Sequence, residues 1–229
     1  MATRVGVIRF PGSNCEFDAV ESINHLGGVG ELLWHDDSDL SGVDAVIVPG
    51  GFAHGDYLRP GAIARFSPIM DAVRDFAAAG GPVLGICNGF QVLTEAGLLP
   101  GALQKNAGLK FRCDTVEVRI ETSNSALTSL MSRGAICRIP INHFEGNYSC
   151  APETLAELRS EDRIVLRYVN NPNGSIDHIA GVCSAGRNVV GLMPHPERAC
   201  HELLGSTDGA PMLRSFLAAA GVTLVGTAD

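Results

Sequence analysis

The sequence is poor in lysine and in aromatic residues. Only two of its 17 basic residues are lysines, Lys105 and Lys110, and only 6% of its 229 residues are aromatic. The formal net charge is −8, and the basic residues form no stripe along the chain. Proteins that bind nucleic acids usually gather Lys and Arg on one face. The composition therefore argues against a nucleic-acid partner.

Closely spaced cysteines and long apolar runs are also absent. The seven cysteines include no pair separated by two to four residues, so neither a zinc site nor a disulfide framework is predicted. No apolar run reaches the length of a membrane-spanning helix, and the first one stops at Pro11-Gly12, too early for a signal peptide. We expect a cytoplasmic protein with reduced cysteines, no membrane partner and no metal.

The remaining composition is that of a folded protein. Apolar residues make up 45% of the chain and charged residues 18%, which is enough apolar surface for a buried core. We find no internal repeat, low-complexity tract or linker composition. Residues 1–229 are therefore expected to form one domain.

In the first half, runs rich in Val and Ile alternate with stretches of helical period. This alternation predicts βα units that build a parallel sheet flanked by helices. The predicted strands lie near 5–10, 30–34, 44–49 and 82–87. The predicted helices cover 14–26, 67–79 with Ser67 as N-cap, and the residues from Cys87 to about Glu95.

The pattern changes after about residue 110. Apolar and polar residues alternate over 116–121, which is typical of a strand with one solvated face. Further strands are expected at 135–141, 163–169, 178–183 and 188–193, and helices at 152–159 and 209–220. The fold class is thus α/β, with a mostly parallel central sheet and antiparallel strands added in the second half.

Residues 85–89 carry the first candidate for chemistry. They read Gly-Ile-Cys-Asn-Gly and follow a predicted buried strand, which is the nucleophile-elbow pattern with cysteine in place of serine. A sharp strand-to-helix turn would strain Cys87 and leave no room for side chains beside it. A buried cysteine next to a glycine-rich turn would give the same short pattern, so the elbow alone does not decide the role of Cys87.

A cysteine nucleophile needs a base, and residues 193–198 (Met-Pro-His-Pro-Glu-Arg) offer one. The prolines favour an extended backbone at His195, where Glu197 would point to the same side of the chain. His195 would then take the thiol proton while Glu197 orients the ring. Backbone N–H groups of Gly51 and Asn88 are candidates for an oxyanion hole.

These features resemble the class I glutamine amidotransferases. The matching segments are 49–51 (Pro-Gly-Gly), 85–91 (Gly-Ile-Cys-Asn-Gly-Phe-Gln) and 195–197 (His-Pro-Glu). The loop over 50–64 and the segments 171–175 and 193–198 are similar to one family in particular. It is the glutamine amidotransferase subunit of phosphoribosylformylglycinamidine synthase, from purine biosynthesis.

The resemblance implies a flavodoxin-like fold and a catalytic triad of Cys87, His195 and Glu197. It implies an enzyme that hydrolyses L-glutamine through a cysteinyl thioester and passes ammonia to a separate synthetase subunit, which amidates formylglycinamide ribonucleotide. ATP and Mg²⁺ are expected on that subunit, and no cofactor is expected on this chain, whose sequence has no P-loop or dinucleotide-binding motif. A small accessory subunit is a further expected partner.

The chain departs from the family pattern at two places. Ala53-His54 stand where Ser-Tyr is expected, and Phe144 stands where Gly is expected in the segment 143–146 (His-Phe-Glu-Gly). Both lie outside the triad. Polar side chains that would suit the head group of glutamine are Gln91, Asn106 and His143, and a solvent-facing role is an equal alternative for each.

Other readings of the elbow fit less well. Glyoxalases and peptidases of the DJ-1/PfpI type have His directly after the cysteine, whereas position 88 is Asn. An α/β-hydrolase would place its acid before its histidine, whereas Glu197 follows His195. A binding module without activity stays possible, but it would not explain the elbow, the histidine and the glutamate together.

Overall fold

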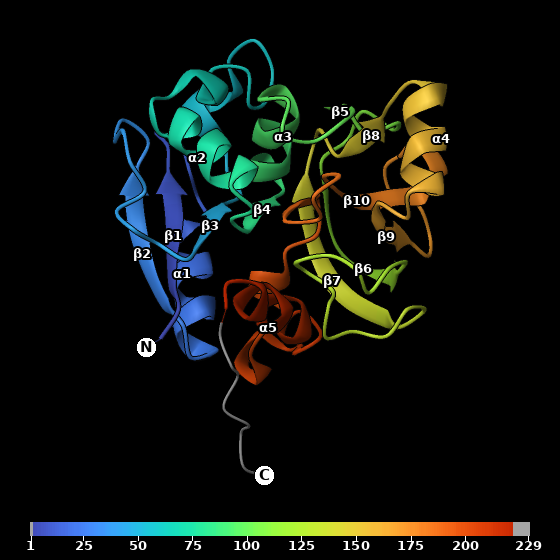
Figure 1. Ribbon diagram of the computed structural model, residues 1–229. Coiled ribbons are helices and arrows are strands. Elements are labelled where there is room, and N and C mark those ends of the chain that lie inside the picture. Colours follow the sequence, from blue (N-terminus) through green and yellow to red (C-terminus); the bar gives the residue numbers. More distant parts are fainter. Residues whose placement is uncertain (1, 222–229) are drawn as a thin grey trace.

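The computed structural model describes residues 2–221. A nine-stranded sheet runs in the order β2-β1-β3-β4-β11-β10-β9-β6-β7, and a two-stranded ribbon pairs β5 with β8 (Figure 1). The strands are β1 (Arg4–Arg9), β2 (Val29–Trp34), β3 (Ala45–Val48), β4 (Val83–Ile86), β5 (Ala102–Gln104), β6 (Arg112–Ile120), β7 (Ile136–His143), β8 (Asn147–Ser149), β9 (Ile164–Tyr168), β10 (Ile179–Cys183) and β11 (Val189–Leu192).

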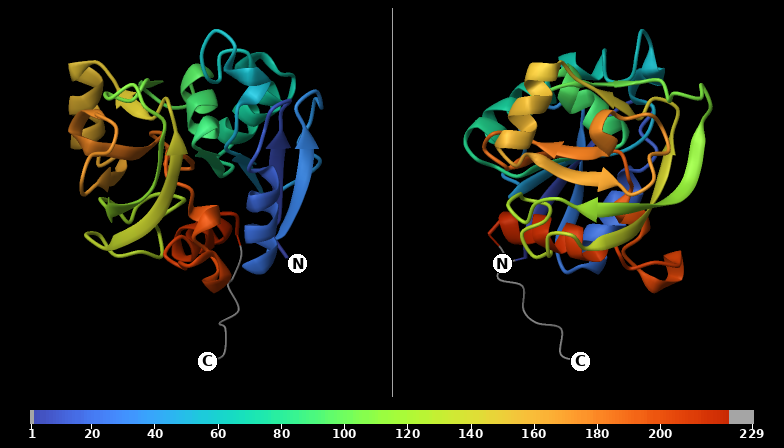
Figure 2. Two further views of the ribbon diagram at one scale, coloured as in Figure 1. Left: turned by 180° about the vertical axis from the view of Figure 1, so that it is seen from behind. Right: turned by 90° about the vertical axis from the view of Figure 1, so that its right-hand side faces the viewer.

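The first five strands of the sheet order are parallel. Four of them, β2, β1, β3 and β4, were predicted to be parallel, and β11 joins them from the second half of the chain. Every residue of β3 and β4 is buried, because helices cover both faces. Figures 1 and 2 show α2 (Ile69–Ala78) and α3 (Asn88–Glu95) on one face and α1 (Glu16–His25) on the other. The carboxyl ends of the parallel strands meet at one edge, where α/β proteins place their ligands.

The remaining strands are antiparallel, and they continue the same sheet from β11 to β7. In β6 the buried residues Val116, Val118 and Ile120 alternate with exposed ones, as predicted. The helices of this half are α4 (Pro152–Ser160) and α5 (Ala210–Ala219). The predicted mixed fold class is confirmed, although β6 begins at Arg112 and β7 runs on to His143.

Short elements differ most from the expectation. The three-residue strands β5 and β8 were not predicted, since pairing with each other is what makes them strands. Single 3₁₀ turns are η1 (Ala53–Asp56), η2 (Ala64–Phe66), η3 (Ile176–His178), η4 (Pro196–Arg198) and η5 (Glu202–Leu204). No helix within residues 2–221 is long and apolar enough to span a membrane.

The predicted N-cap of α2 is wrong. The Ser67 hydroxyl makes no capping hydrogen bond to α2, and α2 begins at Ile69 after Pro68. Instead, the Ser67 hydroxyl lies 3.2 Å from Nδ1 of His35. A tertiary contact has therefore taken the oxygen that a local cap would use.

Candidate active site

Cys87 occupies a strained turn between β4 and α3. Its φ and ψ are 52° and −104°, outside the regions that non-glycine residues normally adopt. The neighbours must be small: a Cβ on Gly89 would lie 1.8 Å from the carbonyl oxygen of Val48, and one on Gly85 would lie 2.8 Å from the backbone of Gly89. The predicted elbow is present, and it presents Cys87 at the carboxyl edge of the sheet.

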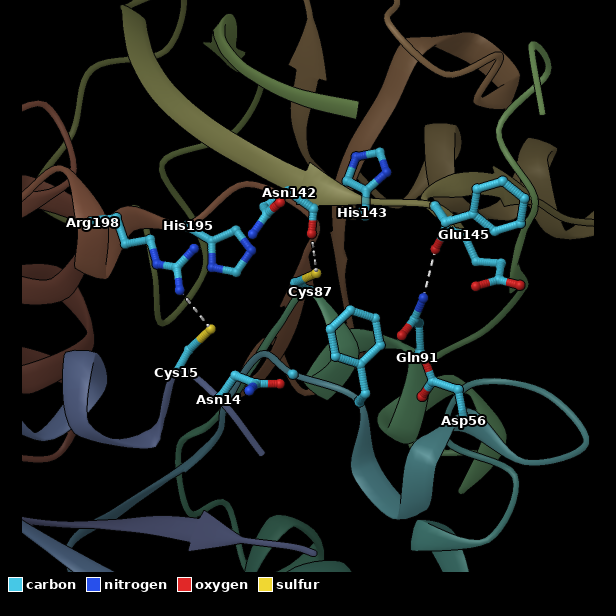
Figure 3. A pocket seen from close by; sticks show the side chains of 13 residues that line it. Asn14, Cys15, Asp56, Cys87, Gln91, Asn142, His143, Glu145, His195 and Arg198 are labelled. Atoms are coloured by element: carbon cyan, nitrogen blue, oxygen red, sulfur yellow. Dashed lines mark hydrogen bonds between the residues drawn. The ribbon is translucent and has the colours of Figure 1, made fainter. Parts of the chain in front are cut away.

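The thiol of Cys87 is 5% exposed and lines a cavity of about 270 Å³. Its Sγ donates a weak hydrogen bond to the carbonyl oxygen of Asn142, 3.6 Å away, and its N–H donates to Leu192 (Figure 3). Asn142 belongs to β7, on the antiparallel side of the sheet. The cavity therefore lies between the parallel and antiparallel parts of the molecule.

His195 and Glu197 form a buried pair at this cavity. The Nδ1 atom of His195 lies 2.6 Å from Oε1 of Glu197, and the residues are 1% and 2% exposed. The predicted contact is present, but the reason given for it is wrong. Pro196 starts the 3₁₀ turn η4, so a tight turn and not an extended chain brings Glu197 back to the ring.

The environment of His195 favours its protonated form. Burial lowers the pKa of His195, but the nearby Glu197 carboxylate and Cys87 sulfur raise it well above its usual value. Because Nδ1 faces Glu197, Nε2 is turned to the other edge of the ring, and within residues 2–221 it has no hydrogen-bond partner. A cationic imidazole next to Cys87 stabilises a thiolate.

The two candidate oxyanion donors lie where predicted. Gly51 lines the cavity in a left-handed conformation with φ 145°, and it bridges to Ser13. Asn88 is the first residue of α3, directly after Cys87. Among residues 2–221, neither backbone N–H donates a hydrogen bond. Both are therefore free to meet an oxyanion.

The three head-group candidates are placed differently from one another. Gln91 and His143 line the cavity, whereas Asn106 does not. Gln91 accepts a hydrogen bond from the Asn88 side chain at 2.9 Å and donates one to the carbonyl oxygen of Glu145 at 2.6 Å. Its amide thus ties the elbow helix to the opposite wall.

Asn106 supports the turn after β7. Its carboxamide contacts Nδ1 of His143 at 3.1 Å, donates to the carbonyl oxygens of Lys110 and His143, and accepts from the N–H of Gly146. Burial, with a smaller contribution from His195, lowers the pKa of His143 to about 4. His143 is therefore neutral at pH 7.

Six polar residues that were not predicted as site residues also line the cavity: Asn14, Cys15, Asp56, Asn142, Glu145 and Arg198. Cys15 could have been suspected, because it follows the first parallel strand as Cys87 follows the fourth. Its Sγ accepts a hydrogen bond from Arg198 at 3.1 Å.

Cys15, His195 and Glu197 are the one group among residues 2–221 with the spacing of metal ligands, their donor atoms lying within 4.8 Å of one another. The Arg198 guanidinium on the sulfur and the engaged Glu197 carboxylate make this cluster a poor cation site.

The two departures from the family pattern have different surroundings. Ala53 is buried, and the His54 ring packs 5.2 Å from the ring of His35. Phe144 lines the cavity, with the Lys105 ammonium 5.9 Å from its ring centre.

The chain is similar to known glutamine amidotransferases. A model of the CobB/CobQ-like glutamine amidotransferase domain matches residues 2–214. The phosphoribosylformylglycinamidine synthase subunit PurQ of Rubrobacter xylanophilus is 59% identical to this chain, over 96% of this chain and 100% of that protein. The PurQ subunit of Koribacter versatilis is 54% identical, over 94% of this chain and 98% of its own length.

Among solved structures, a chain of PurLQS from Thermotoga maritima matches with a TM-score of 0.88 and 42% identity. The match covers 95% of this chain and 99% of that one. Fold, elbow and family model together define the class as a glutamine amidotransferase. Within this class, the chain belongs to the PurQ family, the glutamine amidotransferase subunits of phosphoribosylformylglycinamidine synthase. The family predicted from the sequence is confirmed.

Proposed function

We propose that this chain hydrolyses L-glutamine to glutamate and ammonia with Cys87, His195 and Glu197 as its catalytic triad. The observation that carries the proposal is the strained elbow of Cys87, which shares a cavity with His195 of the buried His195–Glu197 pair. Taken alone, the Cys87 elbow or the His195–Glu197 pair could be a purely structural feature of the core. Together they supply a nucleophile, a base and an orienting carboxylate.

In the first step, the Cys87 thiolate attacks the δ-carboxamide carbon of glutamine. The N–H groups of Gly51 and Asn88 stabilise the oxyanion that forms. Protonated His195 gives its proton to the leaving nitrogen, the C–N bond breaks, and ammonia departs. A thioester between Cys87 and the glutamyl group remains.

In the second step, water attacks the thioester. Neutral His195 accepts a proton from the water, the C–S bond breaks, and glutamate leaves. Glu197 keeps Nδ1 of His195 protonated throughout, which directs Nε2 to the reacting atoms. The proton taken from water returns the imidazole to its starting charge beside the thiolate.

The ammonia is passed to a synthetase subunit that converts formylglycinamide ribonucleotide to formylglycinamidine ribonucleotide. The names of the relatives support this acceptor, and the PurLQS assembly of Thermotoga maritima supports a synthetase and a small accessory subunit as partners. ATP and Mg²⁺ belong on the synthetase. A cytoplasmic location fits the seven cysteines, all of which are unpaired thiols.

The test is the variant Cys87→Ala in the assembled synthase. Glutamine-dependent synthesis should fall by roughly 10,000-fold or more, while synthesis from added ammonium persists, because the thiolate serves only to release ammonia. Cys113→Ala is the matched control, since Cys113 is an exposed thiol that does not line the cavity. Formation of the nucleotide product is measured with each nitrogen source.

Two results would contradict the proposal. Loss of both activities in Cys87→Ala would show that Cys87 supports the whole assembly and does not act as a separate glutaminase nucleophile. Retention of glutamine-dependent synthesis would show that another group attacks the carboxamide.

A further inference from the structure

A second cysteine lies at the His195 end of the cavity, and the proposed chemistry does not use it. Cys15 directly precedes α1, and its side chain makes no hydrogen bond that would cap this helix. The residue is 4% exposed and lines the cavity together with Cys87 and His195. Figure 3 shows Cys15 and Arg198 on the same side of the cavity as His195. Helix capping therefore does not explain the thiol at this position.

The sulfur of Cys15 is fixed by Arg198. Nη2 of Arg198 donates a hydrogen bond to Sγ at 3.1 Å, and Nε of the same guanidinium donates to the Asp18 carboxylate at 3.0 Å. A guanidinium has only donors, so the sulfur is the acceptor in this contact. The backbone N–H of Arg198 also donates to the carbonyl oxygen of His195, at 3.1 Å. Arg198 thus connects Cys15 to the segment that carries the base.

The same sulfur lies beside the His195 ring. The ligand atoms of Cys15, His195 and Glu197 lie within 4.8 Å of one another. A Cβ on Gly50 would lie 3.0 Å from the sulfur and 2.8 Å from Cε1 of the ring, so glycine at this position leaves room for both groups. The hydrogen bond to Glu197 fixes one atom of the ring, and packing beside Cε1 supplies a second point of support.

We propose that Cys15 is a positioning residue for His195, and that its sulfur, held by Arg198, keeps the imidazole in the protonated form that the first step requires. The proposal rests on the proposed glutaminase function and adds to it a residue that acts through the base. A sulfur acceptor next to an imidazolium stabilises this cation. It also offsets the repulsion between the imidazolium and the Arg198 guanidinium.

The other titratable groups around His195 stay in place when Cys15 is changed. Burial lowers the pKa of His195, and its two triad partners raise it. His143, on β7, is neutral at pH 7, because burial lowers its pKa to about 4. Arg198 is always charged, and Asp18 is its ion-pair partner. A change in the titration of His195 on substitution of Cys15 therefore reports the loss of the sulfur.

The test is the pH profile of kcat/KM for glutamine in the complex with the synthetase. Activity should be lost as the pH rises through the pKa of His195, because the leaving nitrogen then receives no proton. In Cys15→Ala this alkaline limb should move to lower pH by about 0.5 to 1 unit, so that kcat/KM above the limb falls by about 3-fold to 10-fold. Cys15→Ser keeps an acceptor for Arg198 and should restore most of the limb.

Two further variants separate this role from simple packing. Cys137→Ala removes a buried thiol that does not line the cavity, and it should leave the profile unchanged. The double variant Cys15→Ala/Arg198→Gln removes the guanidinium that the sulfur had offset, and its limb should move back to higher pH. An equal loss of activity at every pH in Cys15→Ala, the same shift in Cys137→Ala, or a larger shift in the double variant would overturn the proposal.

A measurement without turnover separates this proposal from the proposed function. In full-length Cys87→Ala, NMR titration of the Cε1–H resonance that disappears in His195→Gln gives the pKa of His195, and adding Cys15→Ala should lower it. If the wild-type complex hydrolyses glutamine but neither the limb nor this resonance responds to Cys15→Ala, the role of Cys15 is wrong and the function stands. If the resonance responds but the wild-type complex releases no glutamate, the function is wrong and the effect of Cys15 on His195 stands.

Discussion

The elbow around Cys87 and the loop over 50–61 follow neighbouring parallel strands, yet they are built in different ways. The elbow is buried, and its backbone is pinned by the N–H of Cys87, which donates to Leu192 at 2.8 Å. The loop is open: Tyr57 and Leu58 are 73% and 89% exposed. Burial and hydrogen bonding keep a strained backbone in place, so the nucleophile is preformed by the chain itself.

The loop also carries strain, but less of the chain surrounds it. His54, Asp56 and Leu58 all have left-handed backbone conformations. Near the far end, the Arg59 guanidinium binds the Glu95 carboxylate with two hydrogen bonds of 2.6 Å, and the chain is buried again at Pro60 and Gly61. An exposed segment of this kind is adjusted by ligands and partners more easily than a core turn. We infer from this difference that the elbow carries the catalytic chemistry and that the loop regulates the glutaminase activity.

The variant His195→Ala is the strongest test of the inference that the elbow carries the catalytic chemistry. Without the base, the thioester neither forms nor breaks down efficiently, and glutamine-dependent synthesis should fall by roughly 100-fold to 10,000-fold. Synthesis from ammonium in the same complex is the control. A loss smaller than about tenfold would mean that Cys87 is activated by the helix end alone.

The inference that the loop regulates the activity is tested by separating the chain from its synthetase. We expect the isolated chain to release glutamate roughly 100-fold to 1,000-fold more slowly than the complex, which is the cost of a missing oxyanion donor. The physical reason is that Gly51 leads into the exposed part of the loop, so that a partner bound there would shift its N–H onto the oxyanion. Glutamate release is measured with and without acceptor nucleotide and ATP. Full turnover by the isolated chain would remove the case for control by the loop.

Glu197→Gln should have a smaller effect than His195→Ala, about 10-fold to 100-fold on glutamine-dependent kcat, because the amide still contacts the ring but no longer stabilises its cation. The pH profile of kcat is a second readout, since the pKa of His195 is raised in part by Glu197. A loss equal to that of His195→Ala would show that Glu197 does more than orient and charge the ring.

The smallest expected effects compare stability between the two regions. Gly89→Ala drives a methyl group into the backbone of Val48 and should cost about 3 kcal/mol of unfolding free energy. Gly55→Ala meets only the Tyr57 side chain, at 3.3 Å, and should cost about 1 to 2 kcal/mol for its left-handed backbone. Denaturant unfolding of both variants measures the difference. Equal costs would contradict the contrast between a rigid elbow and a tolerant loop.

Local sequence patterns predicted much of this molecule. The elbow was predictable because its two glycines and its cysteine lie within five residues, and steric rules act over that distance. The parallel strands were predictable because a strand buried on both faces reads as a continuous apolar run. The ribbon of β5 and β8 was not predictable, because a strand of three residues is too short to show an alternation of apolar and polar residues. Each of these strands forms only by pairing with the other.

The sequence by itself predicted the nucleophile, the base and their order along the chain, since each lies in a short motif with its own prolines or glycines. Only the tertiary structure decided what surrounds them. Ser67 bonds to His35 instead of capping its helix. Cys15 lies close to His195, and Asp56 shares a cavity with Glu145, because strands distant in sequence end at one edge of the sheet. Contacts of this kind depend on chain folding over long separations, for which no local spacing provides a signal.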